Sequence, residues 1–410
     1  MNPNDHRTIG HELGIFAGAE AVGAGLPLWL PDGAAIVTEL ERYITEVERR
    51  AGYRHVRTPV LARRELYDIS GHWRYYSNDM FPTMPVGGEE LVLRPVLCPH
   101  HALVYRSALR SYRHLPVRLA ETGPMYRRER SGVLSGLTRV RAITLNDAHH
   151  FCGAEQVVDE VVGVLDLIAD AYQLLGLKAD HIRLSLADGS DKYAGDEESW
   201  RQAEAWLREA LARRDLDFAV APGEAAFYGP KIDIQVLDAD GREFTLSTVQ
   251  VDLYQPARFG LEYVAPDGRR RRPVMVHRSV LASMERMVAY LLESHEGALP
   301  LWLAPVPVLV LPVGPDQLES AHRVLDALRA AGVRAEMDGR EESLGARVAS
   351  GRRRQIPYAA VVGAREAAAG SVAARSLRNS WSAALPVERF VADVAAQINR
   401  RGRDSVPMDR

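Results

Sequence analysis

A predicted strand over residues 139–149 places charged side chains along one of its faces. Neighbouring side chains of a strand point to opposite faces, so every second residue shares a face. The residues on the polar face of this strand would be Arg139, Arg141, Ile143, Leu145, Asp147 and His149. Two arginines, a carboxylate and an imidazole are too polar for a plain core, and they predict a site for an anionic ligand. Solvated side chains at the rim of a sheet are the structural alternative.

Two further predicted strands, residues 231–236 and 245–252, also have a polar face. The side chains on those faces are Lys231, Asp233 and Gln235, and Thr248, Gln250 and Asp252. The other expected elements are helices over 31–52, with Asp32 as its N-cap, 102–112 and 155–175, and extended segments over 55–60 and 117–121. Strands that follow one another without regular βαβ alternation favour an α+β fold, with an antiparallel sheet flanked by helices. The sequence contains no GxGxxG or GxxxxGK[ST], so the usual phosphate-binding loops are excluded.

The pattern of elements changes after Pro300. A strand at 306–313, a helix that ends at Gly332, a strand at 333–337, a helix at 344–354 and a strand at 358–362 form a β-α-β-α-β series. We therefore expect two domains, residues 1–302 and 303–410, with a frayed tail over 401–410.

Composition narrows the class of protein. The 410 residues contain no run near the roughly 20 apolar residues of a membrane span and no apolar signal core, so a soluble cytoplasmic protein is expected. Only two cysteines occur, Cys98 and Cys152, which excludes a disulfide framework. The net charge of −3 does not indicate a nucleic-acid binder. Arginine runs at 269–272 and 352–354 could still contribute to a basic face, or could simply be solvated.

Two long segments resemble sequence motifs of the class II aminoacyl-tRNA synthetases, and most closely those of the threonyl enzymes. MYRRERSGVLSGLTRVRAITLNDAHHFC (125–152) resembles motif 2, and HRSVLASMERM (277–287) resembles motif 3. SGHW (70–73), RPVLCPHH (94–101), AFYGPKID (226–233) and WLAPV (302–306) extend the similarity over nearly the whole chain in the family's order. The resemblance implies a class II catalytic domain over 1–302 and an anticodon-binding-type α/β domain over 303–410.

The resemblance also implies an ATP site. Arg127 would grip the α-phosphate, Glu129 would read the adenine amino group, and Arg139 and Arg286 would clamp the outer phosphates together with Mg²⁺. The ATP-binding residues would be Arg127, Glu129, Arg139, Ile143, Gln250 and Arg286. Arginine suits this work because its guanidinium is always charged and binds phosphate oxygens in a bidentate fork. Arg127, Arg286 and Lys231 would assist the in-line attack of the amino-acid carboxylate on the α-phosphorus.

Cys98, His149 and His277 fall at the family's three zinc-ligand positions. A thiolate and two imidazoles form a sound Zn²⁺ set that leaves coordination open for substrate; from the residues alone, a buried cysteine and two core histidines are the alternative. The resemblance implies that the α-amino and β-hydroxyl groups of threonine bind the metal. The amino-acid pocket would then consist of Asp147, Tyr228, Lys231, Leu145 and Val96. Valine lacks the hydroxyl and is rejected, whereas serine is harder to reject.

For the transfer to tRNA(Thr), His72 takes the position of the histidine that assists proton removal from the ribose; a structural histidine before a packed Trp73 is the alternative. Pro59, in a segment that resembles motif 1, suggests a homodimer. The chain starts directly at the catalytic core, so we expect a form without the editing domains, which misactivates serine.

Several positions depart from the family. Ile143 replaces an adenine-stacking aromatic and Leu145 replaces a glutamine, while residues 376–382 replace a more basic loop. Small glycines of the family are replaced by His100, Ala142, Ser247 and Ala282. These changes keep two other hypotheses open: a paralogue that activates threonine or a related amino acid for a carrier protein or another acceptor, and a regulatory binding module without catalysis. The three arginines and three metal ligands argue against the latter.

Overall fold

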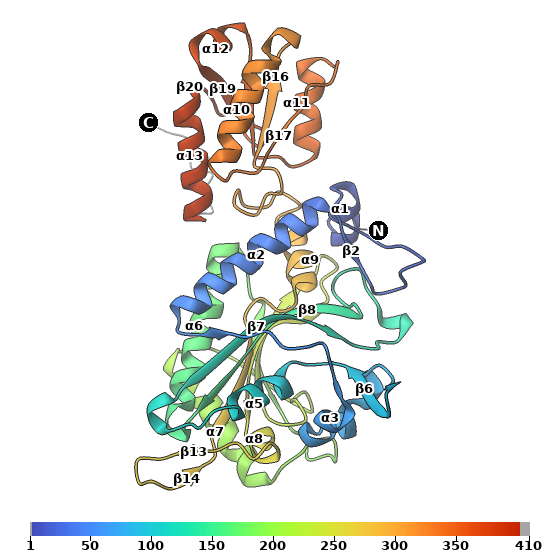
Figure 1. Ribbon diagram of the computed structural model, residues 1–410, viewed down its shortest axis with the longest axis vertical. Coiled ribbons are helices and arrows are strands. Elements are labelled where there is room, and N and C mark those ends of the chain that lie inside the picture. Colours follow the sequence, from blue (N-terminus) through green and yellow to red (C-terminus); the bar gives the residue numbers. More distant parts are fainter. Residues whose placement is uncertain (1, 402–410) are drawn as a thin grey trace.

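The computed structural model describes residues 2–401. Of the tail expected over 401–410, only Arg401 therefore lies within the described residues, and its guanidinium lies 2.6 Å from the Glu46 carboxylate. Within this range no helix is long and apolar enough to cross a membrane. The chain forms a lower body around a large sheet and an upper unit coloured orange to red (Figure 1).

The large sheet has eight strands. Their order is β10 (Ala219–Pro222), β9 (His181–Leu186), β11 (Lys231–Leu237), β12 (Glu243–Asp252), β15 (Val274–Ser279), β8 (Ala142–Cys152), β7 (Val117–Tyr126) and β3 (Arg54–His55). Neighbouring strands run antiparallel except at the two edges, where β10 pairs with β9 and β3 with β7 in parallel. The antiparallel sheet and the α+β class predicted from the sequence are confirmed.

Helices cover one face of this sheet. They are α2 (Pro31–Arg50), α6 (Val157–Leu175), α7 (Glu197–Arg213) and α9 (Met284–Ser294). Their apolar sides pack with Val249, Val251 and Val276 of the strands in one core cluster. Because β-strand side chains alternate, the residues between these valines, such as Gln250 and His277, point to the opposite face. The polar sheet face expected from the sequence is therefore the face that the four helices leave uncovered.

Smaller elements lie around the sheet and the helices that cover it. They are α1 (His6–Glu12), β1 (Phe16–Ala17), β2 (Leu28–Trp29), β4 (Leu61–Arg63), α3 (Arg64–Ser70), α4 (His72–Tyr76), β5 (Met84–Val86), β6 (Glu89–Leu93), α5 (Cys98–Arg106), α8 (Tyr254–Arg258), β13 (Tyr263–Val264) and β14 (Arg270–Arg271). The helix α5 packs Cys98, Ala102 and Tyr105 against Phe151 and Met275 of the sheet. This packing closes one end of the polar face.

Four sequence-based boundaries are wrong. The strand predicted over 139–149 begins at Ala142, so Arg139 and Arg141 lie in the loop before it. The helix predicted over 102–112 spans Cys98–Arg106, because Pro99 sits in its first turn, where a missing N–H costs nothing. The N-cap of α2 is Leu30 rather than Asp32, since Pro31 occupies the first helical position. Of the extended segment predicted over 55–60, only His55 pairs in a strand of the large sheet.

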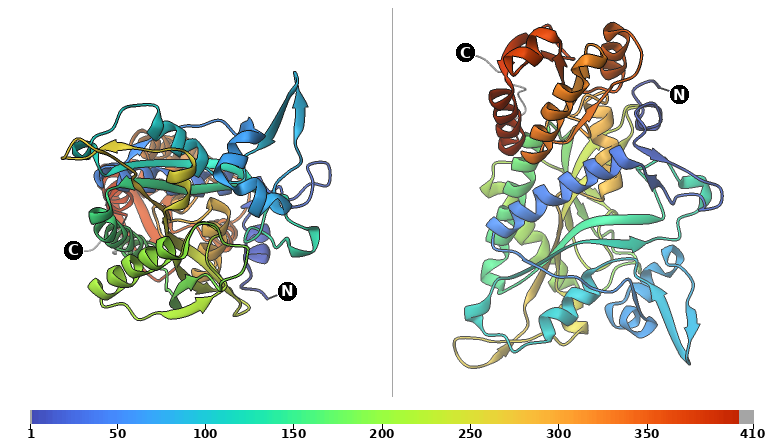
Figure 2. Two further views of the ribbon diagram at one scale, coloured as in Figure 1. Left: turned by 90° about the horizontal axis from the view of Figure 1, so that it is seen from below. Right: turned by 45° about the horizontal axis from the view of Figure 1, so that its top comes forward.

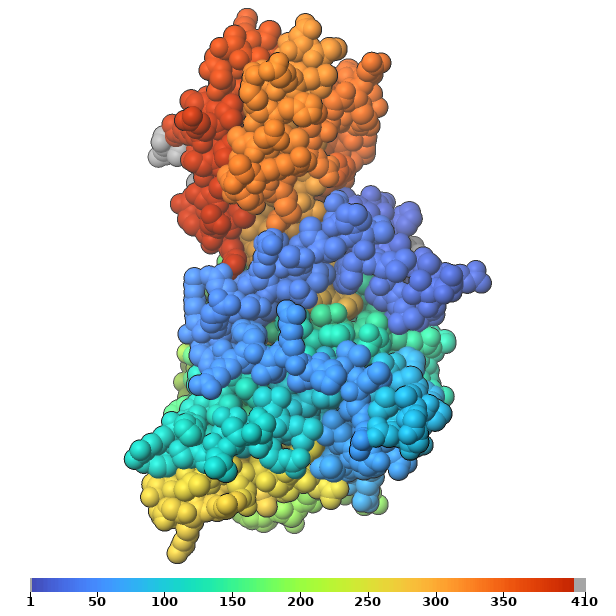
Figure 3. Space-filling view, in the orientation of Figure 1, coloured from blue at the N-terminus to red at the C-terminus, as the bar shows by residue number. Residues whose placement is uncertain are grey.

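The upper unit has its own sheet and core. Its strand order is β17 (Ala335–Met337), β16 (Val308–Pro312), β18 (Tyr358–Val362), β19 (Ser371–Ser376) and β20 (Ser382–Pro386), and its helices are α10 (Leu318–Ala330), α11 (Leu344–Arg353), α12 (Ala364–Ala369) and α13 (Val387–Arg400). The β-α-β-α-β series predicted from the sequence is present, and the final β19–β20–α13 portion was not predicted. The unit stands on the lower body across a narrow waist (Figures 2 and 3).

Candidate active site

A cavity of about 210 Å³ opens on the polar face of the large sheet. It is lined by all of the sequence-predicted site residues except His72 and Lys231: Val96, Cys98, Arg127, Glu129, Arg139, Ile143, Leu145, Asp147, His149, Tyr228, Gln250, His277 and Arg286. These residues come from α5 and the loop before it, the loop between β7 and β8, β8, the loop before β11, β12, β15 and α9. The fold thus brings into one cavity residues that lie as much as 190 positions apart.

Three arginines crowd one end of the cavity. Arg127, Arg139 and Arg286 all line it, and burial together with the repulsion of the other two guanidinium groups lowers the pKa of Arg286 to about 10. The Arg127 Nε is buried and has no hydrogen-bond partner among the residues that the structure describes. Arg286 is held by backbone carbonyls, at 2.8 Å from Thr138 O and 3.3 Å from Thr245 O. The three guanidinium groups lie together, and the Arg127 Nε–H has no partner among the described residues. Such an arrangement forms a site for a polyanion.

Glu129 belongs to the same end of the cavity. Its carboxylate accepts a hydrogen bond from Arg139 Nε at 2.9 Å, and its backbone φ of 30° is unusual for a residue with a side chain. Residues held in such conformations cluster at functional sites. Arg141, which the strand pattern placed on the same face, turns away instead. Its guanidinium donates to the carbonyls of Ala24, Arg128 and Glu129, so the prediction that it faces the site is wrong.

At the other end of the cavity, Cys98, His149 and His277 form a potential metal site. One donor atom from each residue lies within 4.8 Å of those of the other two, and all three side chains are buried. His149 and His277 are direct partners across the β8–β15 pair, whereas Cys98 comes from the first turn of α5. Burial and the nearby Asp147 raise the pKa of the Cys98 thiol, so a cation is needed to hold it as a thiolate.

Hydrogen bonds orient both imidazoles of this triad. His277 Nε2 lies 2.8 Å from Asp252 Oδ2, which leaves its Nδ1 for a metal. His149 Nδ1 lies 2.8 Å from His101 Nδ1, and His101 Nε2 lies 3.2 Å from Glu121. Carboxylates that fix the tautomer of a ligating histidine are the usual outer shell of metal sites. The donor set and its supports therefore fit a zinc ion.

Asp147 and Tyr228 lie between the two ends of the cavity. Burial raises the pKa of Asp147 to about 7, and its Oδ2 lies 3.7 Å from His149 Nε2. The Tyr228 hydroxyl donates to Gln250 Oε1 at 2.5 Å, and its ring stacks on His277 with ring centroids 4.6 Å apart. This pair and the Asp147 carboxyl offer polar groups for a small substrate next to the metal triad.

Two predicted residues lie just outside the cavity lining. His72 is buried, accepts or donates a hydrogen bond at 2.9 Å with Ser70 Oγ, and has its Nε2 3.9 Å from Cys98 Sγ. Lys231 sits opposite Gln250 in the β11–β12 pair and binds Asp233 at 2.5 Å. Both side chains border the site, and their roles stay predictions.

The sequence reasoning missed Thr245 and Arg278 in the cavity wall. The β11–β12 register shifts between Ile234 and Gln235, so alternation counted along β12 fails before Ser247 and gives no signal for Thr245. Arg278 is buried against Glu48 at 2.7 Å and over the Tyr53 ring. No strand is predicted over residues 274–279, so the position of Arg278 had no signal in the sequence.

Comparison with known proteins places this cavity in a family. Residues 83–295 match the model of the tRNA synthetase class II core domain (G, H, P, S and T), and residues 307–397 match that of an anticodon binding domain. Over 98% of its length, the chain is 35% identical to a structure of the RNA binding domain of threonyl-tRNA synthetase from Cryptosporidium parvum, with a TM-score of 0.92 and 99% of that structure covered. The chain belongs to the threonyl-tRNA synthetase family.

Other relatives agree with this assignment. The threonine–tRNA ligase of Halalkalibacterium halodurans is 51% identical and threonine–tRNA ligase 1 of Bacillus subtilis is 48% identical, each over 97% of this chain. The chain spans 62% of the length of each of these two enzymes. The prolyl-tRNA synthetase of Giardia lamblia, 18% identical with a TM-score of 0.72, shares the fold over 97% of the chain. The resemblance stated from the sequence motifs is confirmed.

In this threonyl-tRNA synthetase family member, three of the positions expected to depart from the family, Ile143, Leu145 and Ala282, line the cavity. Ile143 and Leu145 follow each other on the site face of β8, and Ala282 has a positive φ of 53° at the entrance to α9. Ser247, by contrast, is fully buried, with its hydroxyl 2.5 Å from the Val280 carbonyl and 2.9 Å from Tyr172. The arginine cluster and the Cys-His-His triad keep their polar residues, whereas Ile143 and Leu145 add apolar surface to the cavity wall.

Proposed function

We propose that this chain activates threonine with ATP as an aminoacyl-adenylate and transfers it to tRNA. One observation carries the proposal: a three-arginine cluster and a Cys-His-His triad open into the same cavity. The family to which the chain belongs supports this assignment of the two ends. A scaffold or regulatory module has no physical need for both.

In the proposed reaction, Arg127 binds the α-phosphate, and Arg139 and Arg286 bind the outer phosphates, whose remaining charge Mg²⁺ would neutralise. The guanidinium groups spread the charge that develops as the amino-acid carboxylate attacks the α-phosphorus and pyrophosphate leaves. Ile143 packs against the adenine, and Glu129 and Gln250 contribute to the nucleotide site. The ion pair of Glu129 with Arg139 then has to open so that Glu129 can meet the adenine amino group.

Cys98, His149 and His277 would hold Zn²⁺, which supplies a Lewis-acidic position for the α-amino and β-hydroxyl groups of threonine. Asp147 accepts a hydrogen bond from that hydroxyl. Tyr228, Lys231, Leu145 and Val96 complete the amino-acid pocket, and its polar groups select against substrates that leave them unpaired.

For the transfer step, His72 assists removal of the ribose proton. Burial lowers the pKa of His72 to about 3, so the imidazole is neutral at neutral pH and offers a hydrogen-bond acceptor to the ribose hydroxyl, while its basicity is low. Its Nε2 lies 3.9 Å from Cys98 Sγ, beside the amino-acid pocket of the proposed site.

We also propose a division into a catalytic domain, 1–302, and an anticodon-binding-type domain, 303–410. The separate hydrophobic core of the upper unit supports this boundary. A homodimer formed through the segment around Pro59 and a cytoplasmic location are further parts of the proposal.

One observation favours an acceptor other than tRNA for the activated amino acid. In the segment that replaces the expected basic loop, Arg378 does not offer its charge to a ligand, because its guanidinium binds the carbonyls of Leu299 and Gln355 at 2.7 and 2.6 Å. A carrier protein or another small acceptor in place of tRNA is the alternative that this supports.

Amino-acid-dependent exchange of pyrophosphate into ATP tests the proposal. Threonine should stimulate exchange, Arg127→Ala should reduce it by at least about 100-fold because an electrostatic contact in the transition state is lost, and Arg128→Ala, an exposed neighbour outside the cavity, should not. Charging of tRNA with radiolabelled threonine then separates tRNA from another acceptor. Absence of exchange with every amino acid would refute adenylate formation.

A further inference from the structure

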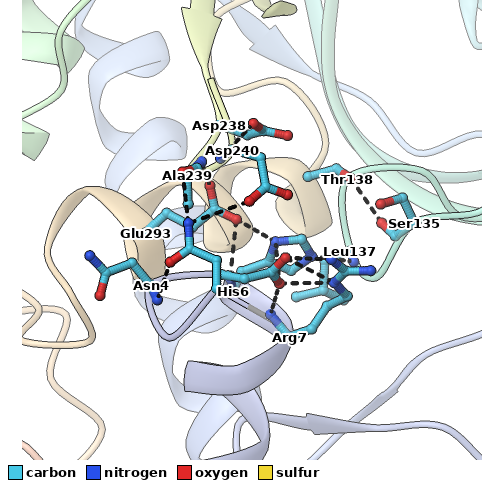
Figure 4. Close-up of polar contacts among 12 residues, drawn as sticks. Asn4, His6, Arg7, Ser135, Leu137, Thr138, Asp238, Ala239, Asp240 and Glu293 are labelled. Carbon is cyan, nitrogen blue, oxygen red and sulfur yellow. Dashed lines mark hydrogen bonds and ion pairs between the residues drawn. The ribbon is translucent and has the colours of Figure 1, made fainter. Parts of the chain in front are cut away.

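A buried polar joint connects His6 with Glu293 and with Leu137 in the loop before β8 (Figure 4). His6, in the first turn of α1, places its Nδ1 2.6 Å from Glu293 of α9, and the Leu137 N–H donates to its Nε2 at 3.1 Å. Since the Leu137 amide can only donate, Nε2 must be the acceptor and Nδ1 must carry the proton. The second acceptor of the joint, Glu293 Oε2, receives the Ala239 N–H at 2.8 Å.

The carboxylates and imidazole of this joint do not form a metal site. Asp5, His6 and Glu293 have donor atoms within 4.8 Å of one another. Both nitrogens of His6 are already engaged, Asp5 is bound by the Arg7 guanidinium, and Glu293 accepts N–H bonds at both oxygens. A cation would have to displace several of these hydrogen bonds, so the joint is a structural connection between α1, α9 and the loop that contains Leu137.

The joint also contacts the loop between β7 and β8, which carries Arg127 and Arg139, two of the arginines proposed to bind ATP. Gly136 comes so close to His6 that a Cβ there would lie 2.2 Å from Nε2, and its φ of +47° favours glycine. On the other side of the same backbone, Arg286 donates to the Thr138 carbonyl at 2.8 Å. Leu137 and Thr138 are thus held from two sides, and the next residue is Arg139.

We propose that His6 is a positioning residue for the ATP site. Its neutral imidazole, locked in one tautomer by Glu293, accepts the Leu137 amide and fixes where the loop presents Arg139. The N-terminal helix therefore contributes to nucleotide binding without touching the nucleotide. This inference rests on the proposed adenylate-forming function, because it assigns Arg139 to the phosphates.

A matched pair of substitutions separates positioning from simple stability. In His6→Gln, the amide oxygen takes the place of Nε2 and can accept the Leu137 N–H. In His6→Asn, the shorter amide takes the place of Nδ1, so it can donate to Glu293 but cannot reach Leu137. Both variants lose the imidazole and its stacking on Phe16, whose ring centroid lies 6.5 Å away, so the loss of packing is common to both.

The test is pyrophosphate exchange at varied ATP and at varied threonine, at a temperature where circular dichroism shows all three proteins folded. His6→Asn should raise the KM for ATP about tenfold, the effect of one lost hydrogen bond, and leave the KM for threonine unchanged. His6→Gln should stay within about twofold of the wild type. Equal KM values for ATP in the two variants, or parallel changes for ATP and threonine, would overturn the proposal.

Hydrogen exchange at the Leu137 amide, followed by mass spectrometry, gives an outcome that does not depend on activity. His6→Asn should speed this exchange and His6→Gln should not; equal rates in both variants would overturn the inference. A wild-type chain that binds no ATP and catalyses no exchange would refute the proposed function. The amide measurement would still decide whether His6 holds the loop.

Discussion

At the scale of single residues, the cavity depends on buried groups that fix one another. Glu121 lies beneath the metal triad and accepts hydrogen bonds from Arg94, from the Thr58 amide and hydroxyl, and from His101. Burial opposes its charge, but these bonds outweigh that cost and lower the pKa of Glu121 to about 2. The resulting carboxylate sets the tautomer of His101, and through it that of His149. Glu121 thus determines the orientation of His149, a potential metal ligand, through the intervening His101.

Replacement of His101 tests this relay. His101→Ala should weaken zinc binding by about 10–100-fold, the usual effect of removing an outer-shell partner of a ligating histidine. Affinity is measured by competition with a chromophoric chelator. His100→Ala is the control, because His100 is a buried neighbour on α5 whose ring nitrogens have no hydrogen-bond partner among the described residues. Equal losses in both variants would show that only packing around α5 matters.

Discrimination between amino acids tests the metal end. Serine keeps the hydroxyl and lacks only a methyl, so its kcat/KM for exchange should lie about 10–200-fold below that of threonine. Valine leaves Asp147 and the metal position unpaired, so its kcat/KM should lie about 10⁴-fold or more below. Steady-state exchange assays give both ratios. A chain that prefers valine to serine would contradict the assignment of Asp147.

At the scale of elements, strand alternation explains what could be predicted from the sequence. β11 and β12 each bury one face under helices, so a period of two separates the core from the site, and Gln250 could be placed on the site face. Strand alternation does not give the correct face for a residue that lies outside the strand or beside a register shift. Arg141 precedes the strand, and Thr245 lies next to a register shift.

The metal triad could not be predicted from spacing alone. His149 and His277 are paired because β15 lies beside β8 in the sheet, and chain separation carries no information on strand order. Only the resemblance to a family connected these residues. No sequence pattern predicted the hydrogen bond between His6 and Leu137, because these residues lie 131 positions apart in the chain.

The link between α6 and β7 gives a prediction about pH. Burial opposes the ionisation of Glu160, but hydrogen bonds from Arg118 and His150 lower its pKa to about 2, from an ordinary value of 4.5. A depressed carboxyl pKa adds stability that is present above pH 4.5 and is lost as the pH falls towards 2. Glu160→Gln should therefore lower the free energy of unfolding by about 2 kcal/mol at pH 7, and the difference should shrink below pH 4.5.

Urea denaturation between pH 3 and 7 measures this dependence. Asp159→Asn is the control, because Asp159 is the exposed neighbour of Glu160 and pairs with Arg213 at the surface; its effect should be within about 0.5 kcal/mol. A Glu160→Gln deficit that stays constant across the pH range would contradict the charge argument.

At the scale of the whole molecule, Arg334 is one of several arginines that join the upper unit to the lower body. Arg334 precedes β17 and donates to Glu39 of α2 at 2.6 Å and to the carbonyls of Trp302, Ala304 and Pro305. A single guanidinium thus ties together α2, the connecting segment and the sheet of the upper unit. We expect these bonds of Arg334 to stabilise the relative placement of the two units.

Arg334→Ala should lower the free energy of unfolding by about 1–3 kcal/mol, since its partners lose their donors in a largely buried place. Calorimetry should also show the unfolding of the two units separating in temperature. Arg323→Ala removes an exposed pair with Glu319 on α10 and should change little. Loss of stability of the same size in both variants would refute a special role for Arg334.

In the proposed function, the two ends of one cavity bind the two substrates of one reaction, ATP and threonine. Metal-dependent exchange measures this most directly: threonine-dependent ATP–pyrophosphate exchange is assayed with protein stripped by a chelator, then with one equivalent of Zn²⁺ restored, beside Cys98→Ser. We predict that stripping abolishes exchange, that zinc restores it in the wild type, and that Cys98→Ser stays inactive at that zinc level. Exchange that continues unchanged in the stripped protein would contradict the account.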